Sequence, residues 1–173
     1  MIRIVEVFRE IVAATSDLYL ERNENARKIH FYADNFVNIN GELLIRGQTT
    51  EGAKNKYPAI LLFCDNGTPV KETGMKVWDA ETTLNFLIVD DAIPQGNAEL
   101  QREKSVYPVL CPIYDCFLES IRNSPRIFTK ERTLEPEYGI FCNIGGTQSM
   151  FGDFLNGIEI KNLKLKIKEE SCF

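Results

Sequence analysis

The stretch "IEIKNLKLKIKEE", residues 158–170, decides the fold, because it has the apolar–polar alternation of a β-strand with one interruption. Ile158 and Ile160 alternate with charged residues, Asn162 breaks the count, and the alternation resumes at Leu163. A slip of one residue predicts a β-bulge, in which two residues oppose one and the apolar face is recovered afterwards. We therefore predict one strand with a bulge at Asn162.

The second half of this strand separates an apolar face from a basic one. Leucine and isoleucine side chains point inward, and lysines point outward at Lys164, Lys166 and Lys168. Lysines on a strand make its edge a poor template for aggregation. We expect the three lysines to lie on an accessible strand edge.

Further strand-like runs and turn signals occur on the amino-terminal side of this stretch. The run 57–65 is nearly continuous in apolar residues, as in a strand covered on both faces. The run 76–91 is long for a single strand, so we predict a bend near residues 80–82. The other segments of this kind are 28–36, 126–132 and 138–144.

Two segments have the spacing of amphipathic helices. Apolar residues recur at helical intervals over about 2–14, the polar segment 17–28 is predicted to be a connection, and residues 97–123 are predicted to be helical. The order helix, strands, helix, strands is typical of an α+β fold. We expect a single domain over residues 1–173, with two principal helices packed on one face of a mainly antiparallel sheet.

Two cysteines lie in the second helix, within "YPVLCPIYDCFLESI", residues 107–121. Cys111 and Cys116 are five residues apart, which places them about 140° apart around a helix axis. They cannot share a ligand or close a strain-free disulfide while the helix persists. We interpret both as small buried hydrophobic residues.

The same stretch contains a pair of prolines that allows two interpretations. Pro108 or Pro112 could begin the helix, where the missing N–H has no cost. If residues 97–107 are helical as well, the pair must kink the helix instead. The sequence leaves both alternatives open.

Composition excludes several classes of protein. The 173 residues carry a formal net charge of −5, which disfavours a non-specific nucleic-acid binder. The longest apolar run, 58–64, is too short to span a bilayer, and the charged first segment does not resemble a signal peptide. An odd number of cysteines, five, fits reduced thiols better than a disulfide framework. These features point to the cytosol.

Other candidate sites have little support from spacing. His30 is the only histidine and lacks a motif that would pair it with a cysteine. Asp90 and Asp91 are adjacent in a strand and should point to opposite faces, which disfavours a shared cation. The loop "GGTQSMFG", residues 145–152, lacks the lysine and the following helix of a phosphate-binding loop. We predict no catalytic residues, no cofactor and no metal.

Four blocks of the chain resemble a family of small neck or tail-completion proteins of tailed bacteriophages, particularly those of Bacteroides-type hosts. The blocks are "YPAILLFCD" (57–65), "TTLNFLIVDD" (82–91), "YPVLCPIYDCFLESI" (107–121) and "DFLNGIEIKNLKLKIK" (153–168). The resemblance implies a tail-terminator-like fold and a role as a connector, adaptor or terminator ring between portal and tail. It also implies a virion protein, assembled in the bacterial cytoplasm and without enzymatic activity.

Such a ring of six or twelve copies would contact portal, connector and tail proteins and let viral DNA pass without sequence-specific binding. Head-to-tail contacts close into a ring only when the rotation divides 360° evenly. Loops and sheet edges are natural suppliers of these contacts. Candidate contacts are the connection 17–28, the edge of strand 158–168 with the three lysines, and four residues of loop 145–152: Gly145, Gly146, Gln148 and Phe151.

Two alternatives to the ring subunit remain. The first is a cytosolic cysteine-dependent hydrolase that uses His30. The second is a monomeric binding or assembly-chaperone module.

Overall fold

The chain folds into a single curled sheet with helices on both faces. The computed structural model describes residues 4–49, 52, 55–64, 71–72, 78–93, 95–128, 134, 136–144 and 153–169. Its helices are α1 (Ile4–Arg22), α2 (Phe36–Gly47), α4 (Ala98–Gln101), the π-helix η1 (Arg102–Leu110) and α5 (Cys111–Asn123). Its strands are β1 (His30–Asp34), β2 (Ala59–Phe63), β3 (Lys71–Glu72), β4 (Trp78–Asp91), β5 (Ile127–Phe128), β6 (Glu137–Ile144) and β7 (Leu155–Glu169).

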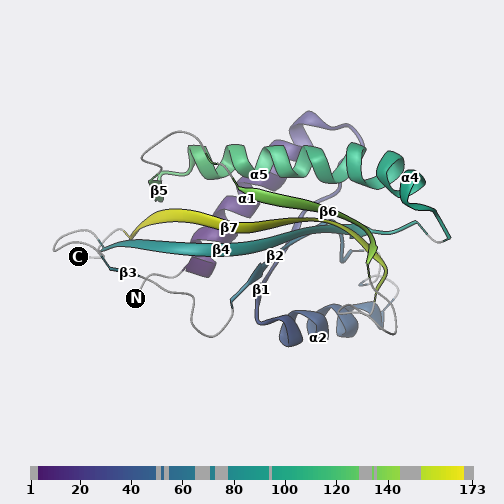
Figure 1. Cartoon of the computed structure of the whole chain (residues 1–173), viewed down its shortest axis with the longest axis horizontal. Coiled ribbons are helices and arrows are strands. Elements are labelled where there is room, and N and C mark those ends of the chain that lie inside the picture. The colour runs from purple at the N-terminus through teal and green to yellow at the C-terminus, as the bar shows by residue number, and fades with distance from the viewer. Residues whose placement is uncertain are drawn as a thin grey trace.

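The sheet is mainly antiparallel, as predicted for an α+β fold. Its strand order is β1-β2-β4-β7-β5, with β3 beside β4 and β6 beside β7. Only the β1–β2 pair, among the described strands, is parallel. Helix α1 and the continuous α4–η1–α5 helix lie on one face, and α2 lies on the other (Figure 1). Among the described residues, no helix combines the length and apolarity needed to cross a membrane.

An aromatic cluster forms the centre of the core between the sheet and the two long helices. The ring of Phe86 on β4 lies 4.8 Å from Phe8 of α1 and 5.2 Å from Phe117 of α5. All three side chains are fully buried. Burying each contributes about 1.5–3 kcal/mol, so this cluster fixes both helices on the same face of the sheet.

The predicted bulge in the last strand is confirmed. Leu84 lies opposite Leu163 and Phe86 lies opposite Ile160, so Lys161 and Asn162 together face Asn85. Asn162 has a φ of 54°, and its N–H donates to Oδ1 of Asn85 at 3.0 Å. The left-handed conformation and this side-chain acceptor absorb the extra residue. Alternation then resumes, and Leu163, Leu165 and Ile167 are buried on the helix side.

The second long helix also runs as predicted, and its prolines lie inside it. The helix is continuous from Ala98 to Asn123 and adopts π-helical geometry over Arg102–Leu110. Pro108 therefore lies within the π-helix, and Pro112 is near the start of α5. The Cys111 N–H donates to the carbonyl of Val106, five residues back. A wider turn relieves the clash between a proline ring and the carbonyl four residues before it.

Two predictions about the amino-terminal region are wrong. Helix α1 continues to Arg22, because Ser16 and Tyr19 extend the buried stripe while the charged residues of the helix lie on the exposed outer face. Residues 17–22 of the predicted connection are therefore helical. Helix α2 was not predicted; it begins after Asn35, whose side chain accepts from the Asn38 N–H at 3.0 Å.

The strands also differ in detail from the prediction. Strand β1 covers only residues 30–34 of the predicted run 28–36, because α2 takes over at Phe36. Strand β4 is one element, and its pairing with β7 shifts register between Leu84 and Phe86; the bend near residues 80–82 stays a prediction. The cause lies in the neighbouring strand, where the bulge of β7 shifts the register.

Candidate functional site

The residues predicted to form contacts fall into two groups. Gly145, Gly146, Gln148 and Phe151 lie outside the described residues. Lys164, Lys166 and Lys168 lie on the face of β7 opposite the two long helices, as the alternation predicted. The ammonium groups of Lys166 and Lys168 lie 5.9 and 4.9 Å from the centre of the Phe128 ring.

The prediction that these lysines occupy a strand edge is wrong for Lys166 and Lys168; at Lys164 no described strand pairs with that side of β7. Strand β7 lies inside the sheet, with β4 along one side and β6 and β5 along the other. The register places Lys166 opposite position 81 and Lys168 opposite position 79 of β4. Lys166 and Lys168 therefore belong to the face of a strand that is paired on both sides, which is a different kind of surface from an edge.

Helix α2 presents the first of two exposed apolar surfaces. Ile39 and Leu43 pack against the sheet, whereas Val37 and Ile45 are 74% and 67% exposed on the outer side, with Leu44 also exposed. A helix that is apolar on both sides is typical of one that is covered on both sides. We call Val37, Leu44 and Ile45 the α2 outer face.

Strand β6 presents the second exposed apolar surface, beyond β7. Tyr138 is 61% exposed, Ile140 is 41% exposed, and Phe141 is also exposed. The Tyr138 ring lies 5.3 Å from the ring of Tyr114 on α5. Among the described strands β6 pairs only with β7, so its other side is a sheet edge. We call Tyr138, Ile140 and Phe141 with this free side the β6 edge.

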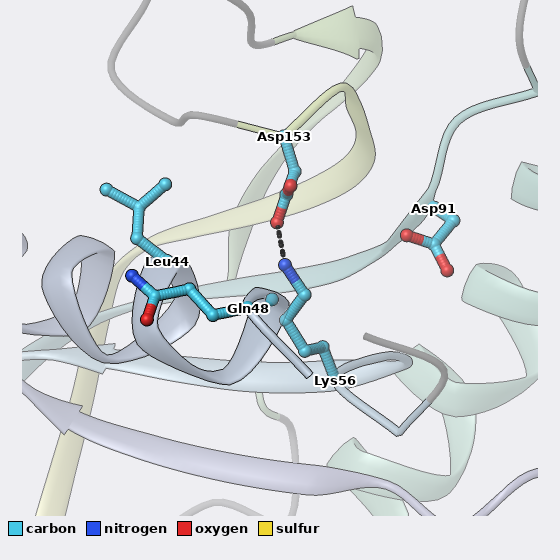
Figure 2. Close-up of a pocket in the computed structure, with 6 residues that line it drawn as sticks. Leu44, Gln48, Lys56, Asp91 and Asp153 are labelled. Atoms are coloured by element: carbon cyan, nitrogen blue, oxygen red, sulfur yellow. Dashed lines mark hydrogen bonds and ion pairs between the residues drawn. The ribbon is translucent and has the colours of Figure 1, made fainter. Parts of the chain in front are cut away.

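A pocket of about 620 Å³ adjoins the carboxyl end of α2. Figure 2 shows Lys56 pointing toward Asp153, with Asp91 to one side and α2 residues to the other. The residues that line the pocket are Leu44, Gly47, Gln48, Lys56, Asp91 and Asp153.

Lys56 is the centre of a hydrogen-bonded group in this pocket. Its buried ammonium lies 2.5 Å from Oδ2 of Asp153, which also accepts from the Tyr57 hydroxyl at 2.9 Å. A Cβ atom on Gly47 would lie 2.8 Å from the Lys56 Nζ, so a larger residue there would displace the end of the Lys56 side chain. These hydrogen bonds join the segment before β2, which carries Lys56 and Tyr57, to the segment before β7, which carries Asp153. The joined segments lie next to the carboxyl end of α2.

The electrostatics of the pocket favour a structural role for this group. Burial, followed by the charge of Asp153, raises the pKa of Tyr57 well above its usual value, so the hydroxyl stays protonated and donates. Burial also raises the pKa of Asp91, and repulsion from Asp90 and Asp153 adds to this effect. In the described part of the chain, no group of three potential ligand side chains could hold a metal ion.

The adjacent aspartates separate as predicted. Asp90 is buried and its Oδ1 lies 2.6 Å from Nη2 of Arg27, whereas Asp91 lines the pocket. Burial raises the pKa of Asp90, and Arg27 opposes that shift. Asp90 therefore serves to fasten the segment after α1 to the end of β4.

Cys116 is buried in the core, as predicted, whereas Cys111 is only half-buried against it. Burial raises the pKa of the Cys111 and Cys116 thiols, which disfavours the thiolate that a nucleophile requires. Burial and the charges of Arg46 and Lys28 lower the pKa of His30. These shifts give no support to a cysteine–histidine pair.

The pattern in "NFVNINGELLIRG", residues 35–47, could have revealed the α2 outer face. It has an N-cap asparagine and apolar residues at helical spacing, but asparagine and glycine within it weaken the helix signal. The Lys56–Asp153 pair could not have been found, because its members are 97 residues apart in the sequence.

Comparison with models of known protein families gives no match, and comparison with curated proteins gives none either.

Proposed function

We propose that this protein is a structural virion protein, a subunit of a ring in the neck or tail of a tailed bacteriophage. In this role it joins portal to tail as a connector, adaptor or terminator, and viral DNA passes through the ring. The phage assignment comes from the sequence resemblance. The structural support is one observation: two separate exposed apolar surfaces, the α2 outer face and the β6 edge.

The positions of these surfaces suit a subunit with neighbours on two sides. The α2 outer face lies on the sheet face opposite α1 and α5, near β1 and β2. The β6 edge lies beyond β7, at the other side of the sheet. Isolated exposed apolar residues are ordinary, but groups of them mark interaction surfaces. A subunit with two such surfaces can contact two neighbours at once.

The proposal is tested by measuring mass and shape. Light scattering coupled to size exclusion should give a mass of several times 19.8 kDa, and negative-stain images should show rings of six or twelve copies. The variant Ile45→Glu should lower the mass, because it places a charge on the α2 outer face. Leu20→Glu, on the exposed side of α1, is the matched control and should leave the mass unchanged.

Particles test the phage assignment directly. Gradient-purified virions of the phage that encodes this chain should contain six or twelve copies, counted by quantitative mass spectrometry against the portal protein. A chain that stays monomeric at high concentration and is missing from the particles would contradict the proposal and favour the binding or chaperone module. A cysteine that reacts with iodoacetamide much faster than a free thiol at neutral pH would favour the hydrolase.

A further inference from the structure

We infer that β6 pairs with β6 of a second copy of this chain. The two strands run antiparallel about a two-fold axis at Gly139 and join both sheets into one. This inference uses only the strand order and the residues of β6, so it does not rest on the proposed phage function.

The first argument is that the regular part of β6, between Pro136 and the register shift before Ile144, lacks the features that normally protect a sheet edge. Natural edge strands carry lysine, proline or bulges that prevent pairing with another chain. Residues 137–141 contain neither lysine nor proline, and Glu137 is their one charged residue. Two of the outward lysines of this region, Lys166 and Lys168, lie where β7 is paired on both sides. The distribution fits an edge that is covered by a partner.

The second argument is the extent of the regular pairing. Strand β6 pairs with β7 without interruption over Glu137–Phe141, and the register then shifts before Ile144. Asn143 lies in this shift with a φ of 57°. The regular edge is therefore five residues long, and Gly139 is its centre.

The third argument is that this register is self-complementary. Antiparallel pairing about Gly139 places Tyr138 opposite Ile140 of the partner copy, on the side of the sheet that carries α5. An aromatic residue opposite a β-branched one is a favourable cross-strand pair. Glu137 falls opposite Phe141 of the partner copy, so the two carboxylates do not face each other.

The surroundings of Gly139 leave room for a side chain at the position of the axis. The ring of Tyr138 is supported by Tyr114 of α5, and the ring of Phe141 covers Gly139 on the other face of its own strand. A Cβ atom at position 139 would meet the Phe141 ring at 3.5 Å, an ordinary contact. A cysteine side chain can therefore be placed there without strain.

Cross-linking at the predicted axis tests the register. Under mild oxidation Gly139→Cys should form an intermolecular disulfide that mass spectrometry assigns to position 139 of both copies, because directly opposed Cβ atoms lie about 4.5–5.5 Å apart. Glu137→Cys is the matched control and should not link to itself, since position 137 falls opposite position 141. The wild-type chain gives the background from its own cysteines.

A second measurement uses mass without cross-linking. Ile140→Lys should weaken self-association at least tenfold in sedimentation velocity, while circular dichroism confirms an unchanged fold. Leu20→Lys, at a position 43% exposed against 41% for Ile140, should have no effect.

Three results would overturn the inference: no link at position 139, equal linking at positions 137 and 139, or unchanged association of Ile140→Lys. A dimer linked at position 139 without rings would support this inference and contradict the proposed function.

Discussion

At the scale of single residues, Asn162 shows how one side chain sets the register of a long strand. Its N–H reaches the side chain of Asn85, and its backbone is left-handed. Asparagine tolerates this conformation better than branched residues do, because its short polar side chain adds little steric strain. The lysines beyond it face outward only because this residue absorbs the extra position.

Replacing Asn162 by valine should lower the free energy of unfolding by about 1–2 kcal/mol, the cost of a left-handed conformation for a residue with a Cβ branch. Asn162→Gly is the control and should change stability by less than about 1 kcal/mol, since glycine adopts this conformation freely. Urea unfolding followed by circular dichroism measures both. If both variants lowered the free energy of unfolding equally, the left-handed backbone conformation would not be the reason that asparagine is needed at this position.

The raised pKa of Asp91 predicts a pH dependence of stability. An acid whose pKa is higher in the folded state than in the unfolded state stabilises the fold at low pH. This contribution is fully present below the pKa of the unfolded state, about 3.8, and is lost as the pH rises through the pKa of the folded state. The charged form at neutral pH is therefore unfavourable to the fold. Asp91→Asn should be more stable than the wild type at pH 7, and this difference should shrink toward pH 3.

Urea unfolding of both proteins between pH 3 and pH 8 measures that difference. Asp17→Asn, on the exposed side of α1, is the control for a general loss of negative charge. A difference between Asp91→Asn and the wild type that does not change with pH would contradict the predicted raised pKa.

At the scale of elements, η1 shows how a helix accommodates proline. Regular α-helical geometry would set the Pro108 ring against the carbonyl of Lys104, and the π-helical turn widens the helix there. The apolar face nevertheless remains in line, with Ile113, Phe117 and Ile121 fully buried. The helix therefore needs neither to begin at these prolines nor to break.

Pro108→Ala should raise the melting temperature, because it restores a backbone donor within the helix. The gain should be about 1 kcal/mol, less than the roughly 3 kcal/mol difference between proline and alanine in a regular helix, since the turn is already widened. Pro125→Ala, in the turn after α5, should give no gain. Differential scanning calorimetry measures both, and a lower melting temperature for Pro108→Ala would show that proline stabilises the π-helical turn.

At the scale of the whole molecule, the segments with a strong apolar–polar repeat in the sequence are the ones whose secondary structure is correctly predicted. The last strand with its bulge, the helix over residues 97–123 and the mainly antiparallel sheet are confirmed. Helix α2 was missed because asparagine and glycine interrupt a short pattern that tertiary packing of Ile39 and Leu43 stabilises. The sequence does not contain the strand order, so it could not show that β5 pairs with β7 at Lys166.

The candidate contact residues also divide into those that the sequence can predict and those that depend on the assembled sheet. The alternation within one strand predicted which face of the sheet carries Lys164, Lys166 and Lys168. The exposure of Tyr138 and Val37 depends on what neighbouring elements leave uncovered, which only the assembled sheet determines. The contact inferred at β6 has a consequence for symmetry: a two-fold contact cannot join neighbours within a head-to-tail ring, so paired β6 strands would join two such rings, and two rings of six give twelve copies.

The bulge at Asn162 also affects how this chain should be aligned with its evolutionary relatives. Each half of β7 holds its own register against β4, and one surplus residue separates the halves. A relative that lacks this residue can retain both halves of the strand with every inward side chain in place. Alignments that forbid gaps within strands would then exchange inward and outward positions over half of β7, and would hide a genuine relationship.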